Sequence, residues 1–294
     1  MASYKTYYKN LVLIGTGTYK YRRYSVELVP QVYTDCLTFT GKESEFTLKA
    51  TNKDWDGSLE YSTDHSTWTI LAGTEEMQSV DKKLYLRGKG NTNFYKAYGV
   101  MWRLSEKADC DGNIQTLLDW ENPPASISAE NCYRSMFNGC TNLTTAPELP
   151  ATTLAQSCYI DMFNGCTNLT TAPELPATTL AQSCYMSMFN GCTNLTTAPE
   201  LPATTLVGYC YRSMFYGCTN LANIPELPVT TLATWCCANM FEGCSKLKVN
   251  TTSGNKIFTC PSAIQTGAVA RMFESTGGEF TGTPVAGETY YYTA

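Results

Sequence analysis

Residues 132–157 read CYRSMFNGCTNLTTAPELPATTLAQS, and this 26-residue unit recurs along the middle of the chain. The copy over 158–183 differs from it only at Ile160 and Asp161. Copies over 184–209 and 210–235 keep the same framework, and a fifth copy from Cys236 begins faithfully and then diverges. Residues 112–131 form a degenerate leading copy. A fixed period of this length indicates stacked repeats whose terminal copies act as caps.

The unit itself predicts a short helix followed by extended segments. Apolar residues at 132, 133, 136 and 137 have the spacing of a helix with one buried face, so we expect a helix over 132–138 that Gly139 ends. Pro147 and Pro150 make the stretch after Leu143 extended, and residues 152–154 form a second short extended piece. Stacking of these units predicts one right-handed solenoid over 112–250.

Ten of the fourteen cysteines follow the same period, at 132, 158, 184, 210 and 236 and at 140, 166, 192, 218 and 244. A residue that recurs at a fixed structural period is expected to form a column, and a reduced cysteine is a small apolar residue that suits a buried column. We therefore expect the repeat cysteines to be buried and reduced, with disulfides between columns as the alternative. The asparagines at 142, 168, 194 and 220 are expected to form a parallel ladder whose side-chain amides bond to the turn backbone.

Two further parts flank the repeats. Residues 1–35 are rich in tyrosine and carry five Lys or Arg residues against two carboxylates, a composition that favours a segment docking on a partner, with an ordinary edge strand as the alternative. The candidate docking residues are Tyr4, Tyr7, Tyr8, Tyr19, Tyr21, Arg22, Arg23 and Tyr24. Residues 36–104 alternate apolar and polar side chains at 37–39, 46–48, 59–61 and 84–86, which predicts a β-sandwich-like domain of six or seven strands.

The motif MFxGCTNLTTAPELPATTL resembles the BspA-like leucine-rich repeats of bacterial surface proteins and gut phages, over about residues 106–250. The stretches LTFTGKESEFTLKA, SLEYSTDHSTWTIL and KKLYLRGKGN are similar to the small β-domain that often precedes such repeats, and RMFESTGGEFTGTPVAGETYYY resembles their C-terminal cap. The resemblance implies a leucine-rich-repeat solenoid over 105–250 and a cap over 251–294. The expected fold is mixed α/β and β-rich: a β-sandwich-like domain followed by this solenoid.

Composition excludes several classes of function. The 294 residues carry a net charge of −5, which gives no electrostatic basis for nucleic-acid binding, and no apolar stretch is long enough for a membrane span. His65 is the single histidine and is expected in a solvated turn, and there is no CxxC pair and no phosphate-binding glycine motif. We therefore predict no enzymatic activity, no cofactor and no metal site. Near the start, the apolar run over 11–14 is too short for a secretory signal, which predicts no export by the general secretory route unless a signal was removed.

Two surfaces of the repeats are candidate binding sites. The first is a row of threonines and glutamates that recur at equivalent positions and suit a repeating ligand such as a glycan, the alternative being a solvated face. It comprises Thr144, Thr145, Glu148, Thr170, Thr171, Glu174, Thr196, Thr197, Glu200 and Glu226. The second is the exposed face of the predicted helices, where the copies differ. It comprises Arg134, Asp161, Met186, Arg212 and Tyr216.

These observations favour a non-enzymatic structural protein of a phage virion, a head or tail fibre or a surface decoration, made in the host cytoplasm. Its expected partners are other virion proteins, through the N-terminal segment, and a glycan or protein of the host surface. A homo-oligomer, a trimer in the case of a fibre, is a further candidate. The alternatives are a BspA-like adhesin on a bacterial cell surface and an intracellular interaction scaffold.

Overall fold

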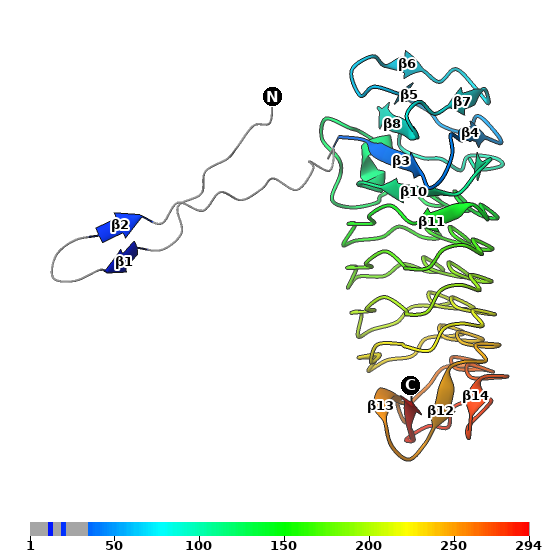
Figure 1. Cartoon of the computed structure of the whole chain (residues 1–294). Helices are drawn as coiled ribbons and strands as arrows, with labels where there is room; N and C mark the ends of the chain where they lie inside the picture. The colour runs from blue at the N-terminus through cyan, green and yellow to red at the C-terminus, as the bar shows by residue number, and fades with distance from the viewer. Residues whose placement is uncertain (1–10, 14–18, 22–34, 294) are drawn as a thin grey trace. The chain divides into compact units, whose positions relative to one another are not determined.

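The computed structural model describes residues 11–13, 19–21 and 35–293, and the chain divides into two compact units, Met1–Tyr33 and Thr34–Ala294. In the first unit, β1 (Leu11–Leu13) pairs antiparallel with β2 (Tyr19–Tyr21). In the second unit, a group of strands is followed along the chain by the stacked repeats and then by a small C-terminal sheet (Figure 1).

The strands before the repeats form two sheets. A six-stranded sheet has the order β11-β10-β3-β8-β5-β6, and a three-stranded sheet has the order β7-β4-β9. All four strands predicted from alternating hydrophobicity are present, as β3, β4, β5 and β8. The bounds are β3 (Leu37–Gly41), β4 (Thr47–Ala50), β5 (Ser58–Ser62), β6 (Thr69–Ile70), β7 (Glu76–Gln78), β8 (Lys83–Lys89), β9 (Trp102–Leu104) and β10 (Ala108–Asp111).

The first repeat, residues 132–157, is continuous with these strands. Its strand β11 (Leu143–Thr145) pairs parallel with β10 and so extends the six-stranded sheet. The short 3-10 helix η1 (Ile114–Leu117) lies between β10 and the first repeat in the chain. Apolar side chains of both parts belong to one buried cluster, which continues through the repeats. The sheet therefore sets the register on which the repeats stack.

The helix predicted over 132–138 is wrong, because this stretch is a series of turns. Amides of alternate residues close three-residue turns, as from Met136 to the carbonyl of Tyr133 at 3.2 Å. The amides of the residues between them point out of the turn and donate to carbonyls of the next repeat, as from Ser135 to the carbonyl of Ile160 at 2.8 Å. Ser135 has φ 58°, in the left-handed region. An α-helix needs right-handed φ at each residue and i to i−4 bonds, whereas here every fourth residue (Asn131, Ser135 and Gly139) has positive φ and the bonds within the turns run from i to i−3.

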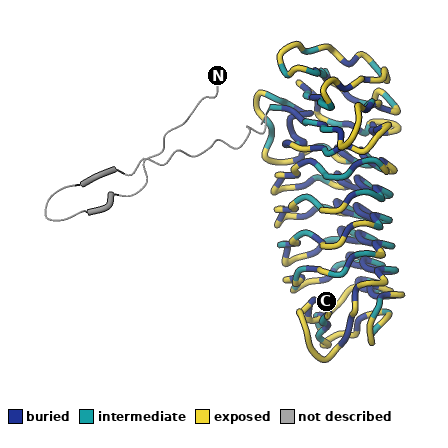
Figure 2. The backbone as a smooth tube through the Cα atoms, in the orientation of Figure 1, coloured by how far each residue is buried: buried dark blue, intermediate teal, exposed yellow. Residues whose placement is uncertain are grey.

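Stacking aligns the same side chains from repeat to repeat. Phe137, Phe163, Phe189, Phe215, Phe241 and Phe273 form a column of parallel rings with centroids 5.5–5.9 Å apart. Cys166 donates its thiol hydrogen to the carbonyl of Phe137 at 3.1 Å, and Cys192 bonds to Phe163 in the same way. All fourteen cysteines are buried and have free thiols. Each coil carries buried and exposed stretches (Figure 2).

The predicted asparagine ladder is present at three of its four positions. The side-chain amide of Asn168 donates to the carbonyl of Thr141 in the preceding repeat, and Asn220 donates to Thr193, each at 2.7 Å. Asn142 donates to Leu104 and Ser105 in the strands before the repeats. These amides tie each turn to the layer before it.

The predicted fold class is wrong. The structure is almost all sheet, with 2% helix and 25% strand, rather than mixed α/β. Within Thr34–Ala294 the strands fall into three separate sheets and do not form a closed solenoid, so this is not a mixed α/β leucine-rich-repeat solenoid. After the first repeat, neighbouring repeats meet through turns and isolated parallel bridges such as Thr145 with Thr171 and Thr153 with Thr179. The prolines explain this, because a residue without an amide hydrogen interrupts a continuous ladder.

Both ends of the stack are closed. At the first repeat, carbonyls that point away from the second repeat accept hydrogen bonds from Phe94, Trp102 and the Arg103 guanidinium. At the other end, β12 (Lys248–Asn250), β13 (Asn255–Thr259), β14 (Gly277–Gly278) and β15 (Thr289–Thr293) form a sheet of order β13-β15-β12-β14. Phe280 and Tyr290 pack around Phe273 and end the phenylalanine column.

Candidate ligand-binding face

The threonines and glutamates predicted as a ligand face occupy equivalent places in successive repeats. We call this set, from Thr144 to Glu226, the Thr/Glu face. The four glutamates are exposed, as are the threonines of the second and third repeats, whereas Thr144 and Thr145 are half-buried. The structure therefore places one carboxylate per repeat in solvent. The full set is Thr144, Thr145, Glu148, Thr170, Thr171, Glu174, Thr196, Thr197, Glu200 and Glu226.

The Pro-Glu-Leu-Pro segment positions each carboxylate. Leu149 is buried in the core, while Glu148 next to it is exposed, because successive side chains of an extended segment point to opposite sides. Both backbone groups of Glu148 are hydrogen-bonded to the preceding segment: its amide donates to Gly112 at 2.9 Å, and its carbonyl accepts from Ile114 at 3.1 Å. The proline rings restrict φ on either side of this pair. The Glu148 carboxylate is therefore carried by a backbone segment of restricted conformation.

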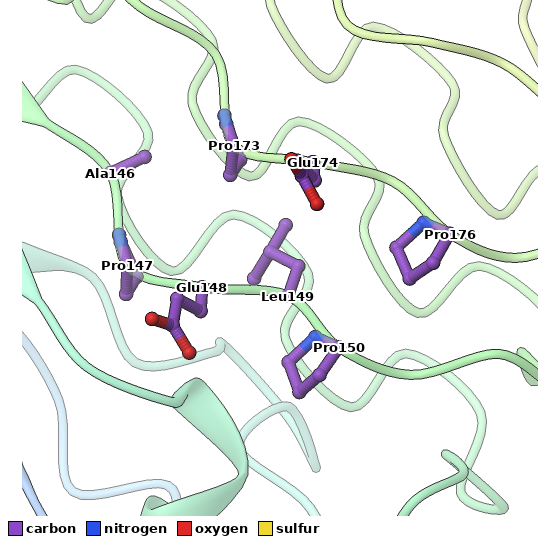
Figure 3. Close-up of a pocket in the computed structure, with 8 residues that line it drawn as sticks. All are labelled: Ala146, Pro147, Glu148, Leu149, Pro150, Pro173, Glu174 and Pro176. Atoms are coloured by element: carbon purple, nitrogen blue, oxygen red, sulfur yellow. The ribbon is translucent and has the colours of Figure 1, made fainter. Parts of the chain in front are cut away.

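A groove lies between the segments of the first two repeats. Figure 3 shows Pro147, Glu148 and Pro150 along one segment, and Pro173, Glu174 and Pro176 along the next. Together with Ala146 and Leu149 these residues line a volume of about 450 Å³. Its walls are proline rings and its polar groups are two carboxylates. It is a shallow, half-apolar groove with a negative rim.

The carboxylates of the face differ in their ion pairs. Glu226 Oε1 lies 2.9 Å from Lys256 Nζ, on β13 of the C-terminal sheet. The backbone explains this contact, since the amide of Leu227 donates to Ile257 at 2.7 Å and so places β13 over the fourth repeat. Across residues 35–293, Glu148, Glu174 and Glu200 form no ion pair. The face is therefore negative over three repeats and neutralised at the fourth.

Two of the threonines already have partners. Thr144 Oγ1 donates to Asp109 Oδ1 at 2.6 Å, and Thr145 Oγ1 accepts from the amide of Cys110 at 3.2 Å. Both contacts join the first repeat to β10. The threonines open to a ligand are therefore those of the later repeats.

The second predicted surface does not lie on helices. Asp161 has φ 54°, and its equivalents Ser135, Ser187, Ser213 and Asn239 have φ between 53° and 58°. Asn and Asp are several-fold enriched in the left-handed region, and serine has the smallest polar side chain, so backbone geometry accounts for the choice at this position. Variation here does not by itself indicate a ligand.

The other members of that surface are partly engaged with neighbours. Arg134 lies 5.0 Å from the ring centre of Tyr95 and donates to Asn131, and Arg212 lies near the rings of Tyr209 and Trp235. Met186 is half-buried. Tyr216 is 41% exposed. Tyr216 is thus the one large side chain of the five that the structure presents to solvent.

The predicted docking residues fall in Met1–Tyr33. Tyr19 and Tyr21 belong to β2. Tyr4, Tyr7, Tyr8, Arg22, Arg23 and Tyr24 lie outside the described residues.

The sequence prediction for His65 is wrong, because this residue is not in a solvated turn. Its side chain is 19% exposed, and its Nε2 lies 3.1 Å from Asp35 Oδ1. The rings of Trp68 and Tyr85 pack edge-on to its imidazole ring, with ring centres 5.6 and 5.1 Å from the imidazole centre. The Cys36 thiol is close by but is fully buried, and burial together with the Asp35 carboxylate raises its pKa to about 12. A nucleophilic cysteine needs a lowered pKa, so this trio is unsuited to thiolate catalysis.

Sequence reasoning also missed an aromatic cluster on the six-stranded sheet. The Arg87 guanidinium lies between two indoles, 3.8 Å from the Trp68 ring centre and 4.0 Å from that of Trp120, and pairs with Glu60 at 3.0 Å. Its members are far apart in sequence, and only strand pairing brings them together.

Comparison with known proteins finds no family model, no curated protein and no solved structure that matches this chain. Within the described residues, no helix has the length and apolar character needed to cross a membrane.

Proposed function

We propose that this protein is a non-enzymatic binding protein of a phage particle, a fibre or surface decoration, that contacts glycans of the host cell surface through the Thr/Glu face. The observation that carries the binding role is the recurrence of Glu148, Glu174 and Glu200 at equivalent positions in three consecutive repeats, exposed and without an ion pair to any of residues 35–293. Placement on a phage particle is supported by the resemblance of the repeat motif. In this proposal the N-terminal segment, residues 1–35, attaches the protein to the particle.

The face suits a repeating ligand. Parallel bridges join face positions of neighbouring repeats, Thr145 with Thr171 and Thr197 with Asn223, so the same hydroxyls and carboxylates recur from one repeat to the next. Carboxylate and hydroxyl oxygens accept hydrogen bonds from sugar hydroxyls. Each contact in so shallow a groove is weak, and affinity comes from many contacts made at once.

Charge narrows the class of glycan. Three unpaired carboxylates repel an anionic polymer, because like charges placed together at an interface cost binding energy. The ligand is therefore a neutral or amino-bearing glycan, and an ammonium group is favoured in particular. The pairing of Lys256 with Glu226 provides an internal example of an ammonium on this face.

The same equivalence supports a role without turnover. Acid–base catalysis by two carboxylates depends on environments that separate their pKa values. Glu148, Glu174 and Glu200 occupy the same position of the repeat and are all exposed, which suits repeated recognition.

A glycan array and whole host cells test this proposal. The purified monomer should bind poorly, and the same protein displayed in many copies on a bead should bind neutral or amino glycans well. Changing Glu148, Glu174 and Glu200 to Gln should weaken the displayed protein at least tenfold, whereas Glu226→Gln, whose carboxylate is already paired, should change it less than twofold. Equal binding by the triple variant, a preference for anionic glycans, or turnover of the glycan would contradict the proposal.

A further inference from the structure

Three side chains with different metal-binding atoms meet at one end of the six-stranded sheet. They are Asp35, Cys36 and His65, and one donor atom from each lies within 4.8 Å of the other two. The carboxylate and imidazole are already 3.1 Å apart. Cys36 is buried beneath them, while the side chains of Asp35 and His65 are 34% and 19% exposed. The cluster thus has a buried sulfur beside a nitrogen and an oxygen that belong to partly exposed side chains.

The sheet register fixes this meeting. Leu37, at the start of β3, pairs with Leu86 on β8, and Leu86 pairs with Tyr61 near the end of β5. The start of β3 and the end of β5 therefore lie level with each other on either side of β8, and the contact of Asp35 with His65, thirty positions further along the chain, joins them. Sites built on paired strands hold their side chains more precisely than sites built on loops alone.

The turn that carries His65 is also held firmly. Asp64 Oδ1 accepts hydrogen bonds from the amides of Ser66 and Thr67, each at 2.8 Å. His65 itself has φ 56°, a conformation that a β-carbon disfavours and that the surrounding turn maintains. Trp68 and Tyr85 pack edge-on to the imidazole and limit its rotation. The nitrogen is therefore aimed at Asp35 by its surroundings.

We propose that Asp35, Cys36 and His65 form a binding site for a divalent transition-metal ion, of which Zn²⁺ fits the donor set best. Thiolate, imidazole and carboxylate are the three ligand types that zinc uses in proteins. Tetrahedral zinc with its usual bond lengths places ligand atoms about 3.3–3.6 Å apart, so the distances between the donor atoms need to change by about 1.5 Å at most. Binding displaces the thiol proton of Cys36 to solvent and leaves a thiolate–metal bond, with no change in oxidation state.

The site is distinct from the Thr/Glu face and does not depend on the function proposed for that face. A bound ion would link the residue that precedes β3 to the turn that follows β5. It would stabilise this end of the sheet, because an ion that binds only the folded state adds its binding free energy to stability.

Cobalt titration of the full-length protein, reduced with a phosphine and freed of metal by chelation, provides the first test. We expect one Co²⁺ per chain with a thiolate-to-cobalt charge-transfer absorption. Because His65 is the single histidine, its imidazole proton resonances form one set and should shift on addition of Zn²⁺. Absence of the charge-transfer band, or imidazole resonances that do not move at several equivalents of Zn²⁺, would overturn the proposal.

Three variants separate the site from the other cysteines. Cys36→Ser should abolish the charge-transfer band, and Cys110→Ser, a matched buried cysteine on neighbouring β10, should retain it. His65→Asn keeps a side chain that tolerates φ above 0° and should lower Co²⁺ affinity at least tenfold with an unchanged circular dichroism spectrum. This last variant keeps the test decisive if Cys36→Ser fails to fold. Two outcomes would overturn the assignment: a His65→Asn variant that binds Co²⁺ with unchanged affinity, or a Cys110→Ser variant that has lost the charge-transfer band.

Discussion

The backbone amide of Phe163 donates a 2.9 Å hydrogen bond to the carbonyl of Met188, twenty-five residues further along the chain. The same offset joins Phe137 to Met162 and Phe189 to Met214. Because donor and acceptor always stand in the same relation, every repeat meets its neighbour in one register. The repeats are then interchangeable layers, and the number of layers is free to vary without changing the interface between them.

Removal of one whole repeat should leave the fold intact. Deleting residues 158–183 joins residue 157 to Cys184 and restores every column, so we expect an unchanged circular dichroism spectrum and a modest fall in the free energy of unfolding from the lost interface. Deleting residues 158–182 leaves one extra residue and shifts each column, so that variant should fail to fold. Unfolding of the first variant, or equal stability of the two, would contradict the stacking register.

The glycine of each repeat should resist substitution where φ is positive. Gly191 has φ +70°, and a β-carbon there would meet Gly165 at an ordinary 3.8 Å, so the cost of Gly191→Ala is conformational, about 1–2 kcal/mol in urea unfolding. Gly208 is the matched control. Its β-carbon would meet Thr234 at 3.7 Å and its φ lies outside the left-handed range, so Gly208→Ala should be neutral or slightly stabilising. Equal effects of the two changes would refute this account of the turns.

Four tyrosines of successive repeats stack in a second column, Tyr133, Tyr159, Tyr185 and Tyr211, and one of their hydroxyls is a group whose removal should stabilise the protein. Tyr159 is buried, and no residue among those described in Thr34–Ala294 accepts or donates a hydrogen bond at its hydroxyl, so Tyr159→Phe should raise the free energy of unfolding by about 1 kcal/mol. Tyr133 occupies the same place in the first repeat, but its hydroxyl donates to Gln115 Oε1 at 2.7 Å. Tyr133→Phe should therefore lower stability by about 1–2 kcal/mol. Changes of the same sign would count against the assigned contacts.

Stability should fall at alkaline pH. Burial raises the pKa of the Cys184 and Cys218 thiols from 9.0 to about 12. Above pH 9 the unfolded chain loses these protons while the folded chain keeps them, so the stability that is fully present below pH 9 declines as pH rises toward 12. Urea midpoints should be flat between pH 7 and 8 and decrease above pH 9. Rapid reaction of the native thiols with a disulfide reagent at pH 8 would contradict the burial on which this prediction rests.

The repeat period in the sequence predicted the equivalence of layers, the burial of the cysteines and the exposure of the glutamates. It did not predict the backbone between Cys132 and Gly139, because apolar residues at 132, 133, 136 and 137 suit either a helix or a series of turns. The residues that distinguish the turns from a helix are the polar ones. Ser135 and its equivalents are Ser, Asp or Asn, each lies four residues before a glycine, and both positions have positive φ.

The partners of the site residues were beyond the reach of the repeat pattern. Lys256 reaches Glu226 from the diverged C-terminal part, where no copy remains to indicate register. His65 meets Asp35 only because β3, β8 and β5 are adjacent in the sheet, and strand order does not follow from hydrophobic alternation. Both contacts depend on tertiary pairing between segments without mutual sequence similarity.

Binding strength as a function of repeat number tests the central claim most directly. Proteins with residues 158–183 deleted, present once or duplicated can be displayed at equal density and titrated onto host cells, or onto the glycan that the array identifies. If the Thr/Glu face recognises a repeating ligand, apparent affinity should fall with one repeat fewer and rise with one more, and replacement of the face glutamates by glutamine should remove this dependence. Binding that is the same for all three folded proteins would show that the ligand contacts another part of the molecule.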